Sequence, residues 1–132
     1  MPTTPKFATF DLLLDKTPRT KLIELTVTDD QGKETKVAMK VKALGFKDYD
    51  DLVGEHPPNK AQIKDGNQWD PETFPPALLS ACAVSPGLTV DEATAIWESD
   101  AWSRGELMDV FVALIKLNSD GLNIPFTSNG SE

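Results

Sequence analysis

Apolar and polar residues alternate along two stretches near the start of the chain, residues 20–27 and 35–44. A turn-forming segment that contains Gly32 separates the two stretches. Alternation of period two on both sides of such a turn predicts an antiparallel β-hairpin with one buried face. The apolar positions expected on that face are Ile23, Leu25, Val27, Val37, Met39 and Val41.

The segment before the hairpin also alternates. In FATFDLLLD, residues 7–15, Phe10, Leu12 and Leu14 occupy every second position, and Pro18 marks a break after them. We therefore interpret residues 7–15 as a further strand. Because a two-stranded ribbon is only marginally stable alone, these strands are expected to pack on helices.

The second part of the chain has the spacing of helices. Short helices are predicted over residues 46–58, stopped at Pro57, and over residues 75–84, ended before Pro86. The polar segment between them, residues 59–68, is expected to be a loop with at most one turn of helix.

Two capping boxes then follow in succession. In each, a hydroxyl residue precedes a glutamate by three positions, Thr89 with Glu92 and Ser103 with Glu106. This pairing satisfies free backbone N–H groups at the start of a helix. The helices predicted from them are residues 90–99 and 104–118.

The last of these helices carries a regular apolar stripe, at the spacing of a face turned to the core. Its members are Leu107, Val110, Phe111, Leu114 and Leu117. The chain is therefore predicted to be α+β, with an N-terminal antiparallel β-hairpin or three-stranded meander followed by a small bundle of about four short helices. The expected regions are a β-rich region (1–45), a helical region of the same domain (46–120) and a flexible C-terminal tail (121–132).

Charge divides the chain unevenly. Residues 1–50 hold nine basic and eight acidic side chains, whereas residues 51–132 hold four basic and thirteen acidic ones. Such acidity disfavours nucleic acid as a partner, because phosphate would be repelled. No apolar run approaches the ~20 residues needed to span a bilayer, so no membrane association is expected. The single cysteine cannot form an internal disulfide and favours a reducing compartment.

Candidate chemistry is sparse, and we expect no catalytic site, no metal site and no cofactor. His56 is the only histidine, and it is interpreted as a cap for free carbonyls at a helix end. Cys82 lies among small apolar residues and is interpreted as a buried hydrophobe. Asp91 and Glu92 fall in the first turn of a predicted helix, where negative charge complements the helix dipole.

Large aromatic residues are concentrated in the helical region, more of them than a few short helices can enclose. Trp97 and Trp102 flank the turn between the last two predicted helices, and either could remain partly exposed. An exposed aromatic patch ringed by charge is typical of a protein-docking surface. The predicted partner-binding residues are Trp97, Trp102 and Phe111.

Four pieces of the chain occur in an order and spacing that resemble one family. They are LVGEHPP (52–58), FPPALLSACAVSPGLTVDEA (74–93), WSRGEL (102–107) and Asn118. Together they resemble the tail assembly chaperones of long-tailed, siphovirus-type bacteriophages, especially those that infect actinobacteria. The resemblance covers about residues 50–120, and Trp102 departs from it, standing where the family pattern has Leu.

The resemblance implies a role without catalysis. Members of that family bind the tape measure protein, keep it soluble until the tail tube polymerises around it, and are absent from the finished virion. It therefore implies the tape measure protein as partner and the host cell cytoplasm as location, and leaves open contacts with the tail tube protein and self-association. The alternative is a small structural or adaptor protein of the virion, such as a tail or head–tail joining component.

Overall fold

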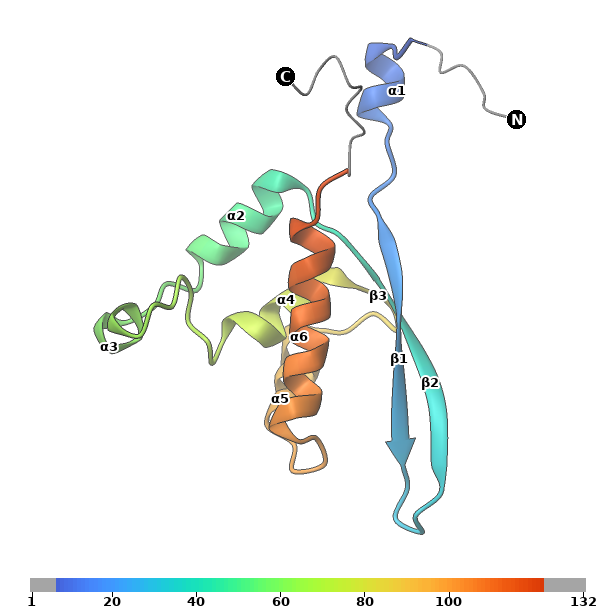
Figure 1. Ribbon diagram of the computed structural model, residues 1–132, viewed down its shortest axis with the longest axis vertical. Helices are drawn as coiled ribbons and strands as arrows, with labels where there is room; N and C mark the ends of the chain where they lie inside the picture. The colour runs from blue at the N-terminus through green and yellow to red at the C-terminus, as the bar shows by residue number, and fades with distance from the viewer. Residues whose placement is uncertain (1–6, 123–132) are drawn as a thin grey trace, which may run out of the picture.

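The computed structural model describes residues 7–122 and contains a three-stranded sheet packed against helices (Figure 1). The α+β class is confirmed. The elements of the described chain are α1 (Phe10–Leu14), β1 (Thr20–Thr28), β2 (Glu34–Lys42), α2 (Phe46–Gly54), α3 (Lys60–Lys64), α4 (Phe74–Cys82), β3 (Ala83–Ser85), α5 (Val90–Trp97) and α6 (Arg104–Ser119). The predicted tail lies, from residue 123 onward, outside the described residues.

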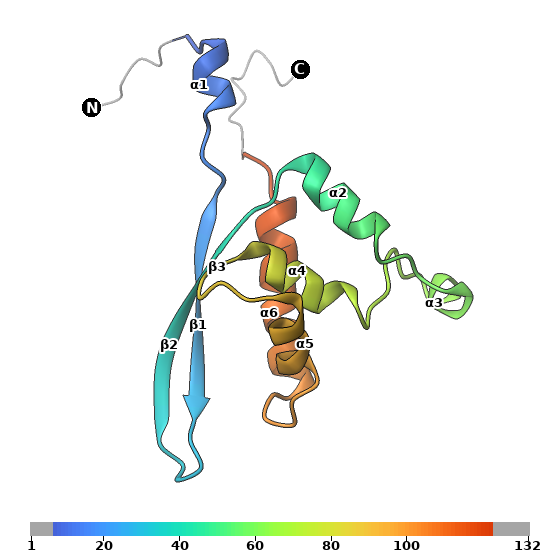
Figure 2. The same ribbon diagram turned by 180° about the vertical axis from the view of Figure 1, so that it is seen from behind.

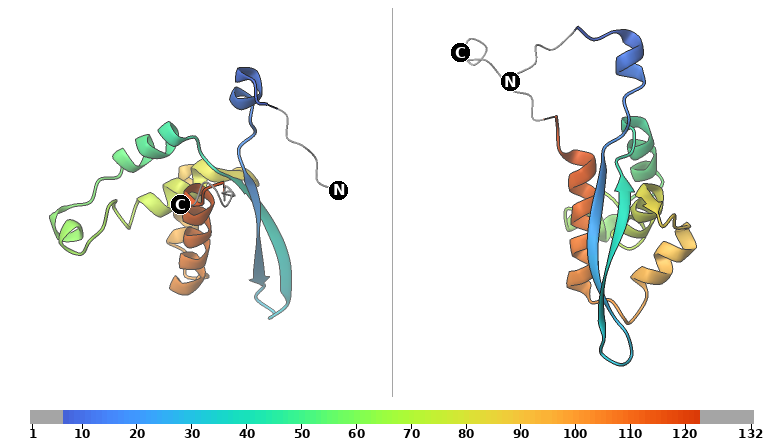
Figure 3. Two further views of the ribbon diagram at one scale, coloured as in Figure 1. Left: turned by 45° about the horizontal axis from the view of Figure 1, so that its top comes forward. Right: turned by 90° about the vertical axis from the view of Figure 1, so that its right-hand side faces the viewer.

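The predicted hairpin is confirmed. β1 pairs with β2 in antiparallel register, with Ile23 opposite Met39 and Leu25 opposite Val37. The turn closes through the Asp29 carboxylate, which accepts hydrogen bonds from two backbone N–H groups of the turn, and through Gly32, whose φ of 83° favours glycine. The hairpin is long and curved, and helices α2 to α6 lie on one of its two faces, whereas α1 lies beyond the start of β1 (Figure 3).

Burial of the inward face is confined to the base of the hairpin, which is the end beside α2 and the C-terminal end of α6. Ile23, Met39 and Val41 are buried there, as predicted. Toward the tip, however, Val27 and Val37 are exposed, although the same alternation continues through them. The alternation therefore identified the inward face correctly, but only half of that face is covered.

The predicted strand over residues 7–15 is wrong, because α1 is a helix. The Thr9 hydroxyl accepts a hydrogen bond from the Leu12 N–H at 3.2 Å, and the Leu13 N–H donates to the Thr9 carbonyl at 3.1 Å. A helix satisfies its backbone groups within the segment, whereas a strand would need a neighbour to pair with. All five residues of α1 are exposed.

The third strand instead comes from the end of the predicted helix 75–84. α4 ends at Cys82, and the chain continues directly into β3, which pairs antiparallel with the base of β2 (Figure 2). Val41 lies opposite Ala83 in this pairing, and the sheet order is β1-β2-β3. The helix is thus shorter than predicted because its last residues form sheet hydrogen bonds.

The remaining helices follow their sequence signals closely. Both predicted capping boxes are formed, at the start of α5 and at the start of α6. A third capping box, Asn59 with Gln62, begins α3 inside the segment expected to be mostly loop. Within residues 7–122, no helix is both long and apolar enough to cross a bilayer.

One core joins the base of the hairpin to α4 and α6. The five residues of the predicted α6 stripe are all buried. All of them except Leu107 belong to one cluster with Val41 and with α4, whose residues from Phe74 to Leu79 are all buried. The side chains that are almost fully enclosed are Phe74, Leu78, Leu79, Leu114, Val41 and Cys82.

Polar side chains fix the end of α6 to the base of the hairpin. Asn118 accepts a hydrogen bond from the Leu44 N–H at 2.8 Å and donates to the Leu114 carbonyl at 2.9 Å. Arg19, just before β1, donates to the Leu117 carbonyl at 2.8 Å. A cation at this position complements the negative end of the helix dipole. These hydrogen bonds hold the C-terminal end of α6 against the start of β1 and the segment that follows β2.

Candidate functional site

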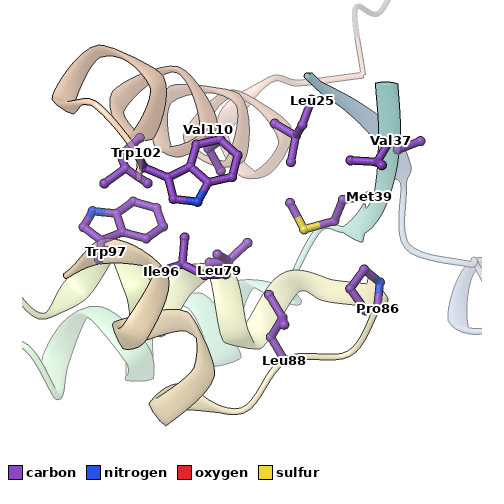
Figure 4. A pocket seen from close by; sticks show the side chains of 12 residues that line it. Leu25, Val37, Met39, Leu79, Pro86, Leu88, Ile96, Trp97, Trp102 and Val110 are labelled. Carbon is purple, nitrogen blue, oxygen red and sulfur yellow. The ribbon is translucent and has the colours of Figure 1, made fainter. Parts of the chain in front are cut away.

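An apolar pocket lies between the hairpin and the helices, immediately beyond the packed core (Figure 4). Its volume is about 290 Å³. Figure 4 shows the Trp97 and Trp102 indoles at one end and Val37 with Met39 of β2 at the other. The side chains around it are Leu25, Val37, Ala38, Met39, Leu79, Pro86, Leu88, Ile96, Trp97, Trp102, Leu107 and Val110. We name it the hairpin pocket.

The pocket exists because α5 is short. The helix ends at Trp97, and the chain turns back through residues 98–103 to the start of α6. The inward face of the hairpin beyond Leu25 is therefore poorly covered within the described residues, and Val27 and Val37 are exposed there. Trp102 and Glu106 line a small hollow beside Val27, and the space between the two indoles and the strands is not filled.

Trp102 has a central position at this surface. It is half-buried on the turn between α5 and α6, and it borders the hairpin pocket, a wider groove of about 610 Å³ and two smaller hollows along β1. Trp97 is also half-buried and separates the hairpin pocket from the wider groove. A large, half-exposed indole at such a junction is the kind of side chain that dominates binding energy at protein interfaces.

The third predicted partner-binding residue, Phe111, is placed differently. Its side chain is buried, and its ring stacks edge-on against Phe74 and Trp69 at centroid distances of 6.1 Å. One edge of Phe111 still lines the wider groove together with Trp97 and Trp102. The structure therefore brings the three predicted residues to one groove, where the tryptophans are half-buried and Phe111 is mainly part of the core.

Acidic side chains lie on one side of the apolar surface. Glu24 of β1 and Glu106 with Asp109 of α6 line the hollow beside Trp102. Glu98 and Asp100 lie in the adjacent turn and are exposed. An apolar pocket with acidic side chains beside it favours a ligand whose apolar face has basic groups on that side.

The hairpin residues of the pocket were not predicted as partner-binding. Val37 and Leu25 were assigned to a buried face, and neither Leu88 nor Ile96 was predicted to be a contact residue. The sequence feature that could have indicated them is the length of the two alternating stretches, because the short predicted helices could not cover the whole inward face of so long a hairpin. Pro86 and Leu88 close the pocket from the loop after β3, a contact that sequence spacing does not reveal.

The interpretation of His56 as a carbonyl cap is wrong. Its Nδ1 lies 2.9 Å from the Thr73 hydroxyl, so the imidazole joins the end of α2 to the start of α4. Nearby, the Asp70 carboxylate accepts hydrogen bonds from the Glu72 N–H and the Gln62 side chain, and these bonds lower the pKa of Asp70. These hydrogen bonds stabilise the loop before α4, and neither His56 nor Asp70 lines the hairpin pocket.

Cys82 is a buried hydrophobe, as predicted. Burial raises the pKa of its thiol, an effect partly opposed by the Asn118 side chain, which donates to the sulfur at 3.6 Å. Burial likewise raises the pKa of Tyr49. Among residues 7–122, no three histidine, cysteine or acidic side chains gather closely enough to hold a metal ion.

Comparison with known proteins yields no match to a family model, to a curated protein or to a solved structure.

Proposed function

We propose that this protein is a phage tail assembly chaperone that binds apolar segments of the tape measure protein and keeps it soluble until the tail tube polymerises around it. The proposal joins the resemblance over residues 50–120 to the hairpin pocket. The observation that carries it is an open, wholly apolar pocket bordered by two half-exposed indoles.

The pocket suits a client that is helical and amphipathic. A helix presents apolar side chains three and four residues apart, and a groove between a sheet and helices can receive one such row. The wider groove beyond Trp97 continues toward Trp69 and combines apolar side chains with Asn67 and Arg104. Binding through several shallow sites gives contact area without a deep cavity, which allows the client to leave when tube subunits compete for it.

Acidity supports the same role. The net charge of −8 keeps a complex with an apolar client dissolved. The acidic side chains beside Trp102, which are Glu24, Glu106 and Asp109, attract basic groups that flank the apolar stripe of a helical client. Neither property requires a nucleotide or a catalytic group.

Co-expression with the tape measure protein of the same phage tests this proposal. The wild-type chain is expected to raise the soluble fraction of the client severalfold, and Trp102→Ala and Val37→Glu should each remove most of that gain. Phe46→Ser serves as the matched control, because Phe46 is exposed on α2 and lines neither the hairpin pocket nor the wider groove. Equal solubility of the client with and without the chain would contradict the proposal.

The alternative role, a structural or adaptor component of the virion, predicts a different result. Mass spectrometry of purified particles should then detect the chain at a fixed copy number per particle. A chaperone should instead be found in the assembly lysate and be missing from the particles.

A further inference from the structure

The outer edge of β1 has no strand beside it in the described chain. The sheet order is β1-β2-β3, and within residues 7–122 no other element forms a backbone hydrogen bond with β1. The strand is nine residues long and pairs with β2 along its whole length without a bulge. Natural sheets usually protect such an edge with a proline, a bulge or a central lysine. β1 contains no proline, and its one lysine, Lys21, is only its second residue, so the edge is open to another strand.

The two ends of the ladder show which backbone groups point to this edge. The Ala43 N–H donates to the Arg19 carbonyl at 2.8 Å, and the Asp29 N–H donates to the Lys33 carbonyl at 2.9 Å. Hydrogen-bonded and non-hydrogen-bonded pairs alternate along an antiparallel ladder, so the odd-numbered residues of β1 bond to β2. The even-numbered residues direct their N–H and carbonyl groups to the free edge, and they are Thr20, Leu22, Glu24, Thr26 and Thr28.

A hollow of about 280 Å³ lies along the same edge, between β1 and α6. Its lining includes Ile23–Thr26, four consecutive residues whose side chains point alternately to the two faces of the sheet, so the hollow follows the edge of the strand. A smaller hollow, lined by Trp102 and Glu106, continues along β1 to Thr28. Figure 3 shows α6 beside β1 on the side away from β2. The two hollows therefore form one groove in which an added strand can lie, and we name it the edge groove.

The edge groove is acidic. Glu24 of β1 and Glu106 with Asp109 of α6 line it, all three are exposed, and no lysine, arginine or histidine lines it within the described chain. A second copy of the chain is a poor occupant. Glu24 is the central residue of β1, so full antiparallel pairing of two β1 strands about a two-fold axis would place Glu24 opposite Glu24. Charge therefore favours a basic segment of a different protein.

We propose that the free edge of β1 binds an extended, lysine- or arginine-rich segment of a partner protein, which adds a fourth strand to the sheet. Backbone hydrogen bonds to the even-numbered residues of β1 supply affinity that is independent of sequence, and the side chains in the edge groove select the basic partner. A basic residue opposite Glu24 forms a cross-strand pair of opposite charge with it.

The other face of the added strand meets α6. Residues opposite Ile23 and Leu25 point to that side, because directly opposite residues of a sheet share a face. The aliphatic part of a lysine or arginine there packs on the Trp102 indole, and its charged end lies near Glu106 or Asp109. Both faces of the added strand therefore favour basic residues.

Amide hydrogen exchange of the full-length chain, resolved by NMR, tests this proposal. The probes are a short, end-blocked peptide that alternates lysine with valine and a matched peptide that alternates glutamate with valine. The lysine peptide should slow exchange of the Leu22, Glu24 and Thr26 N–H groups by about tenfold or more. The Ile23 and Leu25 N–H groups already bond to β2 and should change little. The glutamate peptide should affect neither set.

Two double substitutions locate the attraction. Glu106→Gln with Asp109→Asn removes two charges from the edge groove, and glutamine can keep the capping contact with Ser103. This variant should lose most of the protection by the lysine peptide. Asp48→Asn with Asp51→Asn is the matched control, because it removes the same charge from exposed positions of α2 that do not line the groove. The control should keep the protection.

Three results would each overturn the inference: no protection by the lysine peptide, equal protection by the glutamate peptide, or equal loss of protection in the two double variants. Protection of the same N–H groups without any peptide would overturn it as well, because the edge would then be occupied by the chain itself or by a second copy. None of these experiments contains a client, so the results do not depend on the proposed function.

Discussion

The two halves of the hairpin carry the same sequence pattern and have opposite surroundings. At the base, Val41 is fully buried against α4 and α6. Four residues earlier on the same strand and the same face, Val37 is 41% exposed and borders the hairpin pocket. Hydrophobic alternation thus specifies which face turns inward, but the helices that pack on that face decide how much of it is covered.

This difference separates two roles of apolar residues in one sheet. The base supplies the burial that stabilises the fold, and the tip offers apolar surface that the fold leaves unused. A surface kept open in this way contributes little to folding and is available for binding. Substitutions in the two halves should therefore change different properties of the protein.

The largest expected effect is in the packed half. Leu114→Ala removes a side chain that is almost fully enclosed between α6 and the core, and should lower the free energy of unfolding by about 2 to 5 kcal/mol. Leu22→Ala, on the uncovered face of β1, is the matched control and should change it by less than about 0.5 kcal/mol. Urea unfolding followed by circular dichroism measures both. Similar losses for the two variants would mean that the core that α6 forms with the hairpin is not where stability resides.

Enlarging a valine compares the two halves of β2 directly. Val41→Phe forces extra atoms into a filled core and should cost about 1 to 3 kcal/mol of unfolding free energy. Val37→Phe adds the same atoms beside an open pocket and should change stability by less than about 0.5 kcal/mol. Val37→Phe should also reduce the gain in client solubility on co-expression, because the larger ring occupies the pocket. Equal destabilisation by both substitutions would show that the pocket is closed in solution.

A smaller effect is expected for the polar anchor of the base. Asn118→Ala removes hydrogen bonds to the Leu44 N–H and to the Leu114 carbonyl, and should lower the free energy of unfolding by about 1 to 2 kcal/mol. Gln31→Ala, in the exposed hairpin turn, should leave it unchanged. Thermal unfolding of the two variants provides the comparison, and an unaltered melting temperature for Asn118→Ala would contradict the anchoring role.

The smallest expected effect is a loss of stability at alkaline pH, which originates in Cys82 of α4 and Tyr49 of α2. Burial raises the pKa of Cys82 in the folded protein, so folding favours the neutral thiol. This contribution is complete below the thiol's ordinary pKa of about 8.5 and is lost as the pH rises toward the folded-state value. Tyr49 adds a change of the same sign at higher pH.

Urea midpoints measured between pH 7 and pH 10 check this expectation. The wild-type midpoint should fall across the range, and the midpoint of Cys82→Ala should fall less steeply. A flat wild-type profile would show that the thiol is not buried in solution.

The sequence by itself determined the features whose signals are local. A capping box closes within four residues, so Thr89 with Glu92 and Ser103 with Glu106 marked the starts of α5 and α6 correctly. The spacing along α6 identified all five of its buried residues, because helical geometry brings such positions to one face. The alternation likewise identified the hairpin and its inward face. From their size and position, partial exposure was predicted for one or both of Trp97 and Trp102; both are half-buried, and their role in partner binding stays a prediction.

Only the tertiary structure decided the features that depend on partners distant in the chain. Residues 7–15 alternate like a strand, but no neighbouring strand pairs with them in the described chain, and a capped helix satisfies their backbone instead. Ala83–Ser85 form a strand because β2 offers them an edge more than forty residues away in sequence. The hairpin pocket arises because α5 ends before it reaches the tip of the sheet. Pairing and covering depend on where whole elements meet in space, and the spacing of residues within one element does not contain that information.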